Sequence, residues 1–569
     1  MEKRALIAIG LSALILFGWM WLFPQPTPVP PSPSQPVAAP GSEPAPPSSP
    51  SATAEAEAPA VPAEPAAAGA VEEIRVETDR MTVVLTNRGG RVSSWKLQDY
   101  HDANGEPLEL VPAFASRDDR LPGAVDLDDT ALAERINGAL FLVTREEVRG
   151  ASGPGERIAM RYADGAGLEV TKSLTFERES WLVDLSLNVT DRGRRLPARI
   201  VWGPGFEALD PKARGSQMHY TGQAVWDERG RVTRKAAGSL KEPAILPETG
   251  ALRWAGLEEQ FFAALIVPAG GKGDLALRPV PVTPMPEPGA AADAKPAKPQ
   301  GQVLVAVGVP PEGARLFVGP KKYSLLRQLG YGLDGVVWFS SYQLIAWLAK
   351  YLFLALVWIH DHVVANYGLA IIIATVALRL VFFPLNQYSM VSMRKMQSQM
   401  QRIQPKVNAI KAKYRKLKDA KDRGKMNEEM MALYRQEGVN PMGGMSGCLP
   451  MFVQLPILIA FYNVLTVAVE LRAAPFLGWI RDLTLKDPAY VTPLLMGGTM
   501  FIQQRMTATK GGDPMQQRMM LMMPVVFTVM FLNLPSGLNL YWFVNNLLGI
   551  GQQWLVNRHI GRLEAAGRT

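Results

Sequence analysis

The sequence has little of the chemistry that enzymes and disulfide-linked proteins use. It contains one cysteine, Cys448, and five histidines in 569 residues. A single thiol cannot form a disulfide within the chain, so the cysteine content does not indicate the compartment. No Walker A, HExxH or GxSxG pattern occurs, which argues against the nucleotide, zinc-protease and hydrolase sites that carry those motifs. The formal net charge of +8 is small for this length, so the distribution of charge is more informative than its sum.

The chain is rich in apolar residues, and these are grouped in blocks, which is typical of a membrane protein. The first block, 1–23, has Lys3 and Arg4 followed by about 19 apolar residues, enough to cross a bilayer. A cleaved signal peptide would have a shorter core and a small-residue cleavage site, whereas Pro24 follows here at once. We therefore predict an uncleaved signal anchor with a cytoplasmic amino terminus, since cytoplasmic flanks are the basic ones.

A soluble region follows the anchor. Residues 24–71 are rich in Pro and Ala and predict a semi-stiff linker without a core. Residues 72–325 contain short runs of alternating apolar and polar residues, such as "LEVTKSLTFE" and "WLVDLSLNVTD", separated by turn residues. This period-2 pattern predicts an antiparallel β sandwich on the outer side of the membrane. Residues 270–301 are predicted to be a long loop inside that domain, because strand-like runs resume after them.

The predicted β domain offers little catalytic chemistry. His101 and His219 are its only histidines, and they lie far apart in sequence. Its carboxylates mostly stand beside turns or near basic residues, which favours a solvated surface. A pair of carboxylates brought together by folding remains an alternative.

Two apolar segments begin the membrane region, and the charge beyond them decides which one crosses. Between Gln387 and Cys448 there are 13 Lys/Arg against 5 Asp/Glu, which places that stretch in the cytoplasm. A single crossing then links the outer β domain to it, and 366–388 is predicted to be that span. The preceding region, 326–365, is predicted to lie along the outer interface, with an aromatic-rich segment at 336–359. Hydropathy alone would make 336–359 a span.

The basic stretch, 389–447, predicts a cytoplasmic two-helix hairpin. Apolar residues step by three or four through Met400, Ile403, Val407 and Ile410, and a shorter partner face contains Met430 and Leu433. Pro405 is expected to kink or restart the first helix, and "KDAKDRG" (418–424) is expected to turn the chain. The hairpin lysines fit acidic lipid, ribosomal RNA or simply a solvated helical face. They are Lys406, Lys411, Lys413, Lys416, Lys418 and Lys421.

Four further spans complete the predicted topology. They are 448–467, 490–505, 519–535 and 537–556, joined by a periplasmic loop at 468–489 and a cytoplasmic loop at 506–518. A cytoplasmic tail, 557–569, follows. The total is six transmembrane helices with both termini in the cytoplasm. His360 and His362 form an HxH pair at the outer surface, but without a third ligand they do not predict a metal site.

Arg379 is the anomaly of the membrane region. An arginine within a span costs ~3 kcal/mol or more and usually faces a cavity. About nine residues separate it from the predicted helix end, roughly 13 Å, which is too far for its side chain to reach the cytoplasmic surface. The other predicted spans contain no obvious buried carboxylate to pair with it. The sequence therefore predicts a wet pocket around Arg379 that waits for an acidic partner.

Four long segments of the membrane region carry specific motifs: "VNPMGGMSGCLPMFVQLPILIAFYNVL", "ELRAAPFLGWIRDLTLKDPAY", "DPMQQRMMLMMPVVFTVMF" and "LPSGLNLYWFVNNLLGIGQQ". They resemble the YidC family of membrane protein insertases, relatives of the mitochondrial Oxa and chloroplast Alb proteins. The resemblance covers the whole chain and is closest to the Gram-negative type. It implies a multi-domain inner-membrane protein with a periplasmic all-β supersandwich of the galactose-mutarotase kind and a five-helix core besides the anchor. That core would hold a hydrophilic groove, open to the cytoplasm and to lipid.

The resemblance also implies the residues of the site. The predicted groove contains Arg379, Thr375, Gln454, Tyr541 and Trp542. Trp542 stands where the family often has tyrosine, so any role of that hydroxyl is in question. The predicted face along which a substrate helix slides comprises Cys448, Met451, Pro456, Phe527, Met530 and Phe531. No cofactor and no metal are expected.

The function implied is insertion of integral inner-membrane proteins, with assistance in their folding and assembly, alone or with the Sec translocon. Expected partners are nascent inner-membrane proteins, Sec components, anionic lipids, and the translating ribosome through the hairpin and the C-terminal tail. Two rivals are a secondary transporter of an anionic solute and a membrane-anchored, sugar-processing envelope enzyme. The spans show no internal repeat, which argues against the transporter.

Overall fold

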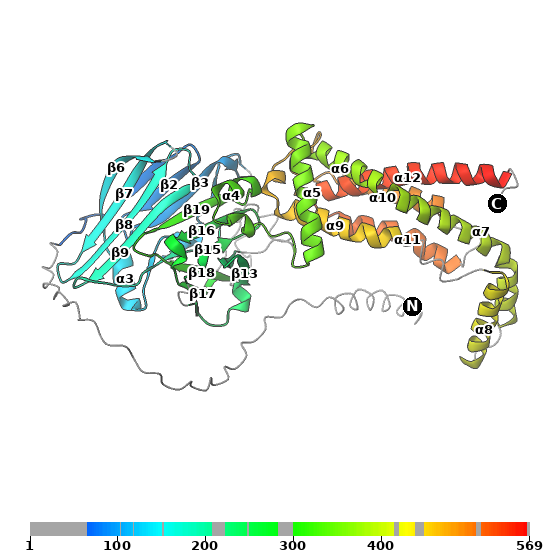
Figure 1. Cartoon of the computed structure of the whole chain (residues 1–569), viewed down its shortest axis with the longest axis horizontal. Helices are drawn as coiled ribbons and strands as arrows, with labels where there is room; N and C mark the ends of the chain where they lie inside the picture. The colour runs from blue at the N-terminus through cyan, green and yellow to red at the C-terminus, as the bar shows by residue number, and fades with distance from the viewer. Residues whose placement is uncertain are drawn as a thin grey trace, which may run out of the picture. The chain divides into compact units, whose positions relative to one another are not determined.

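The computed structural model describes most of the chain beyond residue 64 (Figure 1). The described ranges are 65–102, 104–117, 119–150, 153–206, 222–246, 250–282, 300–414, 420–438, 449–507 and 514–565. The predicted anchor at 1–23, most of the linker and His219 lie outside them. The described residues form a β-rich domain followed by a set of helices.

Three antiparallel sheets make up the β-rich domain. The first has the order β1 (Glu73–Glu77), β2 (Met81–Thr86), β3 (Arg91–His101), β4 (Pro107–Glu109). The second has the order β13 (Arg231–Ala236), β12 (Gln223–Glu228), β15 (Leu252–Glu258), β16 (Phe262–Pro268), β19 (Ala314–Pro320), β9 (Leu182–Asp191), β8 (Leu168–Glu177), β7 (Gly153–Ala163), β6 (Leu142–Gly150), with β10 (Arg194–Arg195) on β9. The third has the order β14 (Ala244–Leu246), β17 (Leu275–Val282), β18 (Gln300–Gly308), β11 (Arg199–Trp202), β5 (Val125–Asp126).

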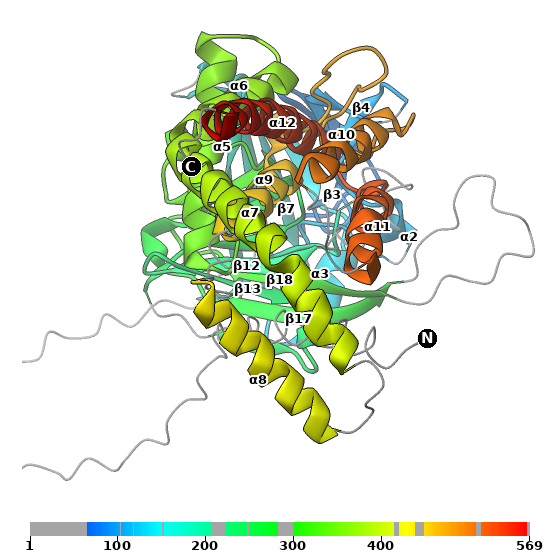
Figure 2. The same ribbon diagram turned by 90° about the vertical axis from the view of Figure 1, so that its right-hand side faces the viewer.

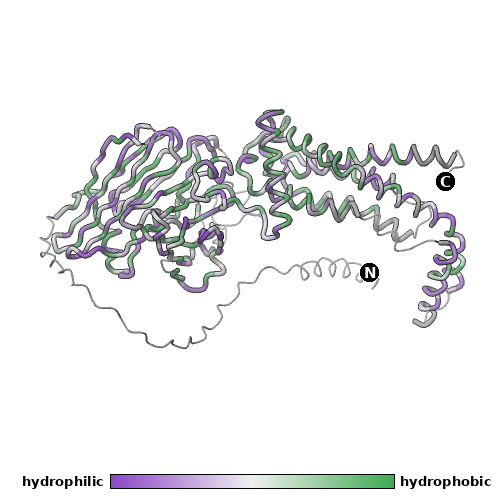
Figure 3. The backbone as a smooth tube through the Cα atoms, in the orientation of Figure 1, coloured by the Kyte–Doolittle hydropathy of each residue, from purple (hydrophilic) through white to green (hydrophobic). Residues whose placement is uncertain are grey.

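The three sheets share one core because their strands alternate as the sequence predicts. Figure 3 shows hydrophilic and hydrophobic residues alternating along the strands, and β9 places every second side chain inside. Trp95 of β3 lies where the sheets meet. Its ring centroid is 5.8 Å from that of Trp202 on β11 and 6.2 Å from that of Phe176 on β8. One aromatic cluster therefore joins residues of all three sheets.

The domain is not purely β, and part of the predicted long loop is a strand. Short helices α2 (Ala113–Arg117), α3 (Thr130–Gly138) and α4 (Tyr323–Leu329) accompany the sheets. Within 270–301, residues 275–282 form β17, which pairs with β18 over its whole length. Its prolines, Pro279 and Pro281, lie beyond the short stretch where β14 pairs with the other edge. They need no outward hydrogen bond there, so proline is tolerated in this strand.

A lysine is buried inside the β-rich domain. Lys172 of β8 is 2% exposed, and its ammonium group donates hydrogen bonds to the carbonyl oxygens of Gly90 and Gly123. Burial, with a smaller contribution from the charge of Arg91, lowers the pKa of Lys172 from 10.5 to about 7. The unfolded chain therefore binds more protons than the folded one between these two values, and stability should rise with pH across that range.

We expect this lysine to give the domain a measurable pH dependence. Between about pH 7 and pH 9.5 the unfolding free energy of the native protein should increase relative to that of Lys172→Met by a few kcal/mol. Methionine has a similar length and no proton to lose, so it cancels the contribution of the other groups. Thermal unfolding followed by tryptophan fluorescence at several pH values measures the difference. A difference that does not change with pH would contradict the prediction.

Eight helices follow the β-rich domain in the described part of the chain (Figures 1 and 2). They are α5 (Gln343–His362), α6 (Tyr367–Val381), α7 (Phe383–Lys413), α8 (Ala420–Gln436), α9 (Leu449–Val467), α10 (Val491–Thr507), α11 (Pro514–Phe531) and α12 (Ser536–Ala565). Figure 2 shows α12 beside α6 and α10, and the contacts between these helices agree. Buried side chains of α5, α6, α9 and α12 form a second core.

Several helix boundaries differ from the predicted ones. α7 continues through Pro405 as one helix, so the restart expected there as an alternative to a kink does not occur. α8 begins at Ala420, inside the predicted turn 418–424. α12 continues to Ala565, so most of the predicted tail at 557–569 is helical. The sequence from 557 to 565 contains no proline and only one glycine, so nothing in it stops the helix.

The predicted seam of the α7–α8 hairpin is confirmed. Ile403 and Val407 of α7 pack against Leu433 of α8, with Met400, Ile410, Met430 and Tyr434 around them. By length and apolar composition, α5 is the one described helix able to cross a bilayer by itself. α6 and the first part of α7 qualify if taken together as a bent span, while Gln454–Val467 and Leu521–Phe531 are shorter apolar helices.

Candidate substrate site around Arg379

Arg379 stands in the last turn of α6, next to a sharp bend. α6 ends at Val381, and the chain turns by 59° between α6 and the start of α7. Pro384 lies in the first turn of α7, where proline is tolerated because the N–H groups of that turn have no partner within the helix. Proline also disfavours a helical conformation in the residue before it, so α6 cannot easily continue into α7. The helix predicted for 366–388 is therefore interrupted: the structure divides it between α6 and the start of α7. Arg379 is two residues from a helix end, where a cation interacts favourably with the helix dipole.

Four of the five predicted groove residues line one small cavity. Thr375 and Arg379 come from α6, Gln454 from α9 and Tyr541 from α12. The sequence reasoning missed the other lining residues, which are Leu378, Phe382, Asn386, Ile457 and Asn545. Asn545 lies one helical turn after Tyr541, so helical spacing could have found it. Asn386 could not be found in this way, because its place depends on the bend before α7.

Hydrogen bonds fix three of these side chains. The Gln454 amide donates to the Tyr541 hydroxyl. The Thr375 hydroxyl donates to the carbonyl oxygen of Ile371 at 2.6 Å, within its own helix. Tyr541 is 1% exposed, and its ring stacks on Phe461 with centroids 4.1 Å apart. Thr375 and Tyr541 are therefore held by the protein and are not free to follow a ligand.

The guanidinium of Arg379 is held less completely. Its Nε atom is buried and has no hydrogen-bond partner among the residues that the structure describes. No ion pair to Arg379 is found within the same residues, and α6, α9, α10 and α11 contain no Asp or Glu at all. A buried donor without a partner is costly, so its presence needs an explanation, such as a bound water molecule or a ligand. Among the described residues, Arg379 is thus a cation without a carboxylate partner, as the sequence predicts.

The cavity is smaller than the wet pocket that the sequence predicts. Its volume is about 10 Å³, close to the least that holds one water molecule. Leu378, Phe382 and Ile457 fill the space beside the polar residues. Any larger ligand therefore requires side chains or helices around Arg379 to move apart.

Trp542 and the described residues of the predicted sliding face lie outside this cavity. Trp542 packs on Phe531 of α11 with ring centroids 5.8 Å apart, and its buried Nε1 has no described partner. On α11, Met530 is 52% exposed, whereas Phe531 is only 1% exposed. Phe527 and Pro456 are half-buried. Cys448 and the side chain of Met451 lie outside the described residues, so the structure brings together only part of the predicted face.

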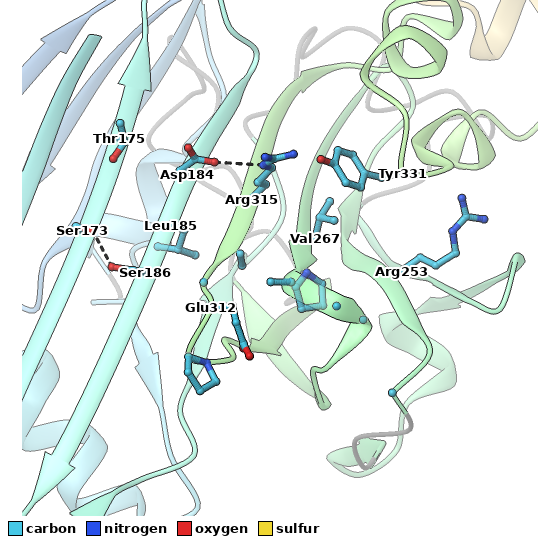
Figure 4. Close-up of a pocket in the computed structure, with 18 of the residues that line it drawn as sticks. Ser173, Thr175, Asp184, Leu185, Ser186, Arg253, Val267, Glu312, Arg315 and Tyr331 are labelled. Atoms are coloured by element: carbon cyan, nitrogen blue, oxygen red, sulfur yellow. Dashed lines mark hydrogen bonds and ion pairs between the residues drawn. The ribbon is translucent and has the colours of Figure 1, made fainter. Parts of the chain in front are cut away.

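A second hollow of about 840 Å³ lies on the β-rich domain (Figure 4). It crosses β7, β8, β9, β19 and β16, and its acidic residues are Asp184 and Glu312. Asp184 pairs with Arg315 at 3.3 Å, and Glu312 lies well apart from it in Figure 4. In this hollow Asp184 is thus engaged by Arg315, and the two carboxylates do not point toward one another.

The two histidines at the end of α5 are engaged separately. His360 contacts Asp361 at 2.9 Å and stacks on Tyr367 at 4.0 Å. His362 lies 3.0 Å from the carbonyl oxygen of Trp358. Within the described ranges there is no group of three or more His, Cys, Asp or Glu residues that could hold a metal ion.

Comparison with known protein families decides between the three functions considered from the sequence, which are the insertase, the transporter and the envelope enzyme. The family model of the YidC periplasmic domain matches residues 73–355, and that of the 60Kd inner membrane protein matches residues 358–562. The chain belongs to the YidC family of membrane protein insertases. It is 37% identical to the membrane protein insertase YidC of Geobacter metallireducens over 99% of this chain and 100% of the relative. It is 32% identical to that of Syntrophus aciditrophicus over 98% and 100%.

Among solved structures, the chain resembles an active YidC insertase whose first transmembrane domain is resolved. The match covers 86% of this chain and 94% of the chain in that structure, with 17% sequence identity and a TM-score of 0.36. Membership of the YidC family means an inner-membrane protein with a β-rich periplasmic domain and a helical core. The family is one of insertases and not of enzymes. Neither the transporter nor the sugar-processing enzyme is supported, and nascent membrane proteins are the substrates that the family implies.

Proposed function

We propose that this YidC-family chain inserts inner-membrane proteins by offering the polar tail of a nascent chain a temporary site at Arg379. The observation that carries the proposal is the buried Nε atom of Arg379, which lacks a partner among the described residues. An acidic tail would supply that partner. In surroundings of low dielectric constant the attraction is stronger than in water, which offsets part of the cost of bringing the tail into the membrane.

The small cavity implies that the groove opens when a substrate arrives. Gln454 is the side chain best placed to move, because a single hydrogen bond, to the Tyr541 hydroxyl, holds it among the residues that the structure describes. An acidic tail that separates these two would gain the Arg379 guanidinium and the Gln454 amide together. The ion pair should be short-lived, because a tail held too well would not be released.

The apolar part of the substrate would leave along α11. This helix exposes Met522, Met523, Val525, Val526, Val529 and Met530. Unbranched methionine side chains adapt to partners of different shape. A substrate helix can therefore pack here before it moves into lipid, and no nucleotide is needed because partitioning into the bilayer supplies the free energy.

The topology we propose has six transmembrane helices and two cytoplasmic termini. The N-terminal anchor, bent α6–α7, α9, α10, α11 and α12 are the spans, and α5 lies along the periplasmic interface. α5 buries one face against α6 and α9 and exposes Trp347, Tyr351 and Trp358, which suit an interface. Figure 1 supports this placement, since α5 runs across α6 and α9 rather than along them.

The same topology brings the basic hairpin to the cytoplasmic side. There it would meet anionic lipid or the translating ribosome, together with the C-terminal end of α12. Two hairpin lysines are already paired, Lys406 with Glu437 and Lys413 with Glu429. Cooperation with the Sec translocon belongs to the same proposal.

Photo-crosslinking from neighbouring positions tests the substrate path. A photoreactive residue at Met530, which is 52% exposed, should crosslink to a stalled nascent membrane protein several-fold more than one at Phe531, which is 1% exposed. The two positions share a helix and differ in exposure, so each serves as the control for the other. Equal crosslinking at both positions, or none at either, would contradict a path along this face of α11.

A further inference from the structure

Gly549 of α12 forms the surface on which the Arg379 side chain lies. A Cβ atom built on Gly549 would come 2.6 Å from Nη2 of Arg379 and 2.6 Å from Nε2 of Gln503. Non-bonded heavy atoms need about 3.5 Å, so a side chain at 549 would displace one or both groups. The bare backbone at Gly549 lets the guanidinium approach from α6 and the Gln503 amide approach from α10.

Nothing in the helix itself accounts for this glycine. Gly549 lies well inside α12, which spans Ser536–Ala565, and an interior glycine makes a helix less stable than alanine does. Its backbone is not in the left-handed region that favours glycine. Gly551, two residues further along, has no atom within 4 Å of a built Cβ. The close approach of Arg379 and Gln503 therefore distinguishes Gly549 from the neighbouring glycine.

We propose that Gly549 is a positioning residue, which sets where the Arg379 charge stands between α6, α10 and α12. Arg379 also borders the cavity of Gln454 and Tyr541. A methyl group at 549 would push the guanidinium or the Gln503 amide away from α12 by about 1 Å. The inference rests on the proposed function, because the position of the charge matters only if Arg379 acts on the substrate.

The test compares Gly549→Ala with Gly551→Ala in the full-length protein. Both changes favour the helix, and the groups that the methyl at 549 meets are the ends of flexible side chains, so neither variant should melt far below the native protein. Insertion of a substrate with an acidic tail should fall roughly three- to tenfold in Gly549→Ala, equivalent to ~0.7–1.4 kcal/mol, and stay unchanged in Gly551→Ala. Insertion of the same substrate with its acidic residues replaced by amides should be equal in both variants.

A double variant separates positioning from packing. Gln503→Ala removes one of the two groups that the new methyl would meet. In the double variant Gly549→Ala, Gln503→Ala the space left by the glutamine lets the guanidinium keep its position. Insertion of the acidic-tailed substrate should therefore regain at least half of the activity that Gly549→Ala loses. A packing defect elsewhere among the helices would not be relieved by removing the Gln503 side chain.

The outcomes distinguish this inference from the proposed function. Equal insertion by the two alanine variants overturns the positioning role, and so does an equal loss for acidic and neutral tails. If Arg379→Ala lowers insertion of acidic tails while Gly549→Ala does not, only the inference fails. If Arg379→Ala has no effect on acidic tails, the proposed function fails and the inference fails with it.

Discussion

Replacing Arg379 by alanine should reduce insertion of substrates with acidic tails by roughly ten- to a hundredfold, equivalent to ~1.4–2.8 kcal/mol. The guanidinium is the partly buried cation beside the cavity, and its Nε atom has no partner among the described residues. An acidic group a few ångströms from it would gain ~4 kcal/mol at an intermediate dielectric constant, of which desolvation takes part back. Complementation of depleted cells, with protease protection of the translocated tail as the readout, measures the effect.

Two further substitutions separate charge from hydration. Arg379→Lys keeps the charge and should retain most of the activity. Arg379→Gln keeps a polar group but no charge, so it should resemble alanine if attraction is what matters and resemble lysine if the residue mainly keeps the groove wet. The matched substrates carry tails with Asp and Glu or with Asn and Gln. If alanine supports every substrate as well as arginine does, the proposed role of the charge is wrong.

Local patterns in the sequence predicted most of the elements of the fold. Alternation located β8 and β9, and helical spacing gave the seam that joins Ile403 and Val407 to Leu433. These features depend on residues close together in the chain. The strand β17 was missed because "LALRPVPV" contains two prolines, which are acceptable only since one edge of that strand is largely unpaired.

The site was only partly predictable, for a physical reason. Hydropathy merges α6 and α7 into one span because apolar residues continue through Pro384, and it therefore misplaced the helix end beside Arg379. The unpaired arginine was visible from composition. The approach of Arg379 to Gly549, and the closing of the cavity by Leu378, Phe382 and Ile457, depend on how distant helices pack. No spacing within one helix contains that information.

Asp487 offers the second large expected effect, on stability rather than on insertion. It lies in the loop before α10 and is fully buried. Its carboxylate accepts hydrogen bonds from Trp479 Nε1 at 2.9 Å, Ala489 N at 2.9 Å, and the Thr492 backbone and hydroxyl at 2.7 and 2.8 Å. One side chain thus satisfies the first turn of α10 and closes the loop that leads to it.

Alanine at 487 should destabilise the helical core by ~3 kcal/mol, because it leaves the buried donors of Thr492 and the indole N–H of the partly exposed Trp479 without a partner. Asp487→Asn keeps an acceptor and should lose less stability, while Lys486→Ala removes an exposed neighbour and should leave stability unchanged.

Burial raises the pKa of Asp487, but the hydrogen bonds from Thr492, Ala489 and Trp479 outweigh it and hold the pKa below its usual 3.8. Stability from this group is therefore complete above that value and is lost as the pH falls through the lowered pKa. Thermal unfolding of the purified protein near neutral pH should show the full loss for alanine, and a melting temperature equal to that of Lys486→Ala would contradict the assignment.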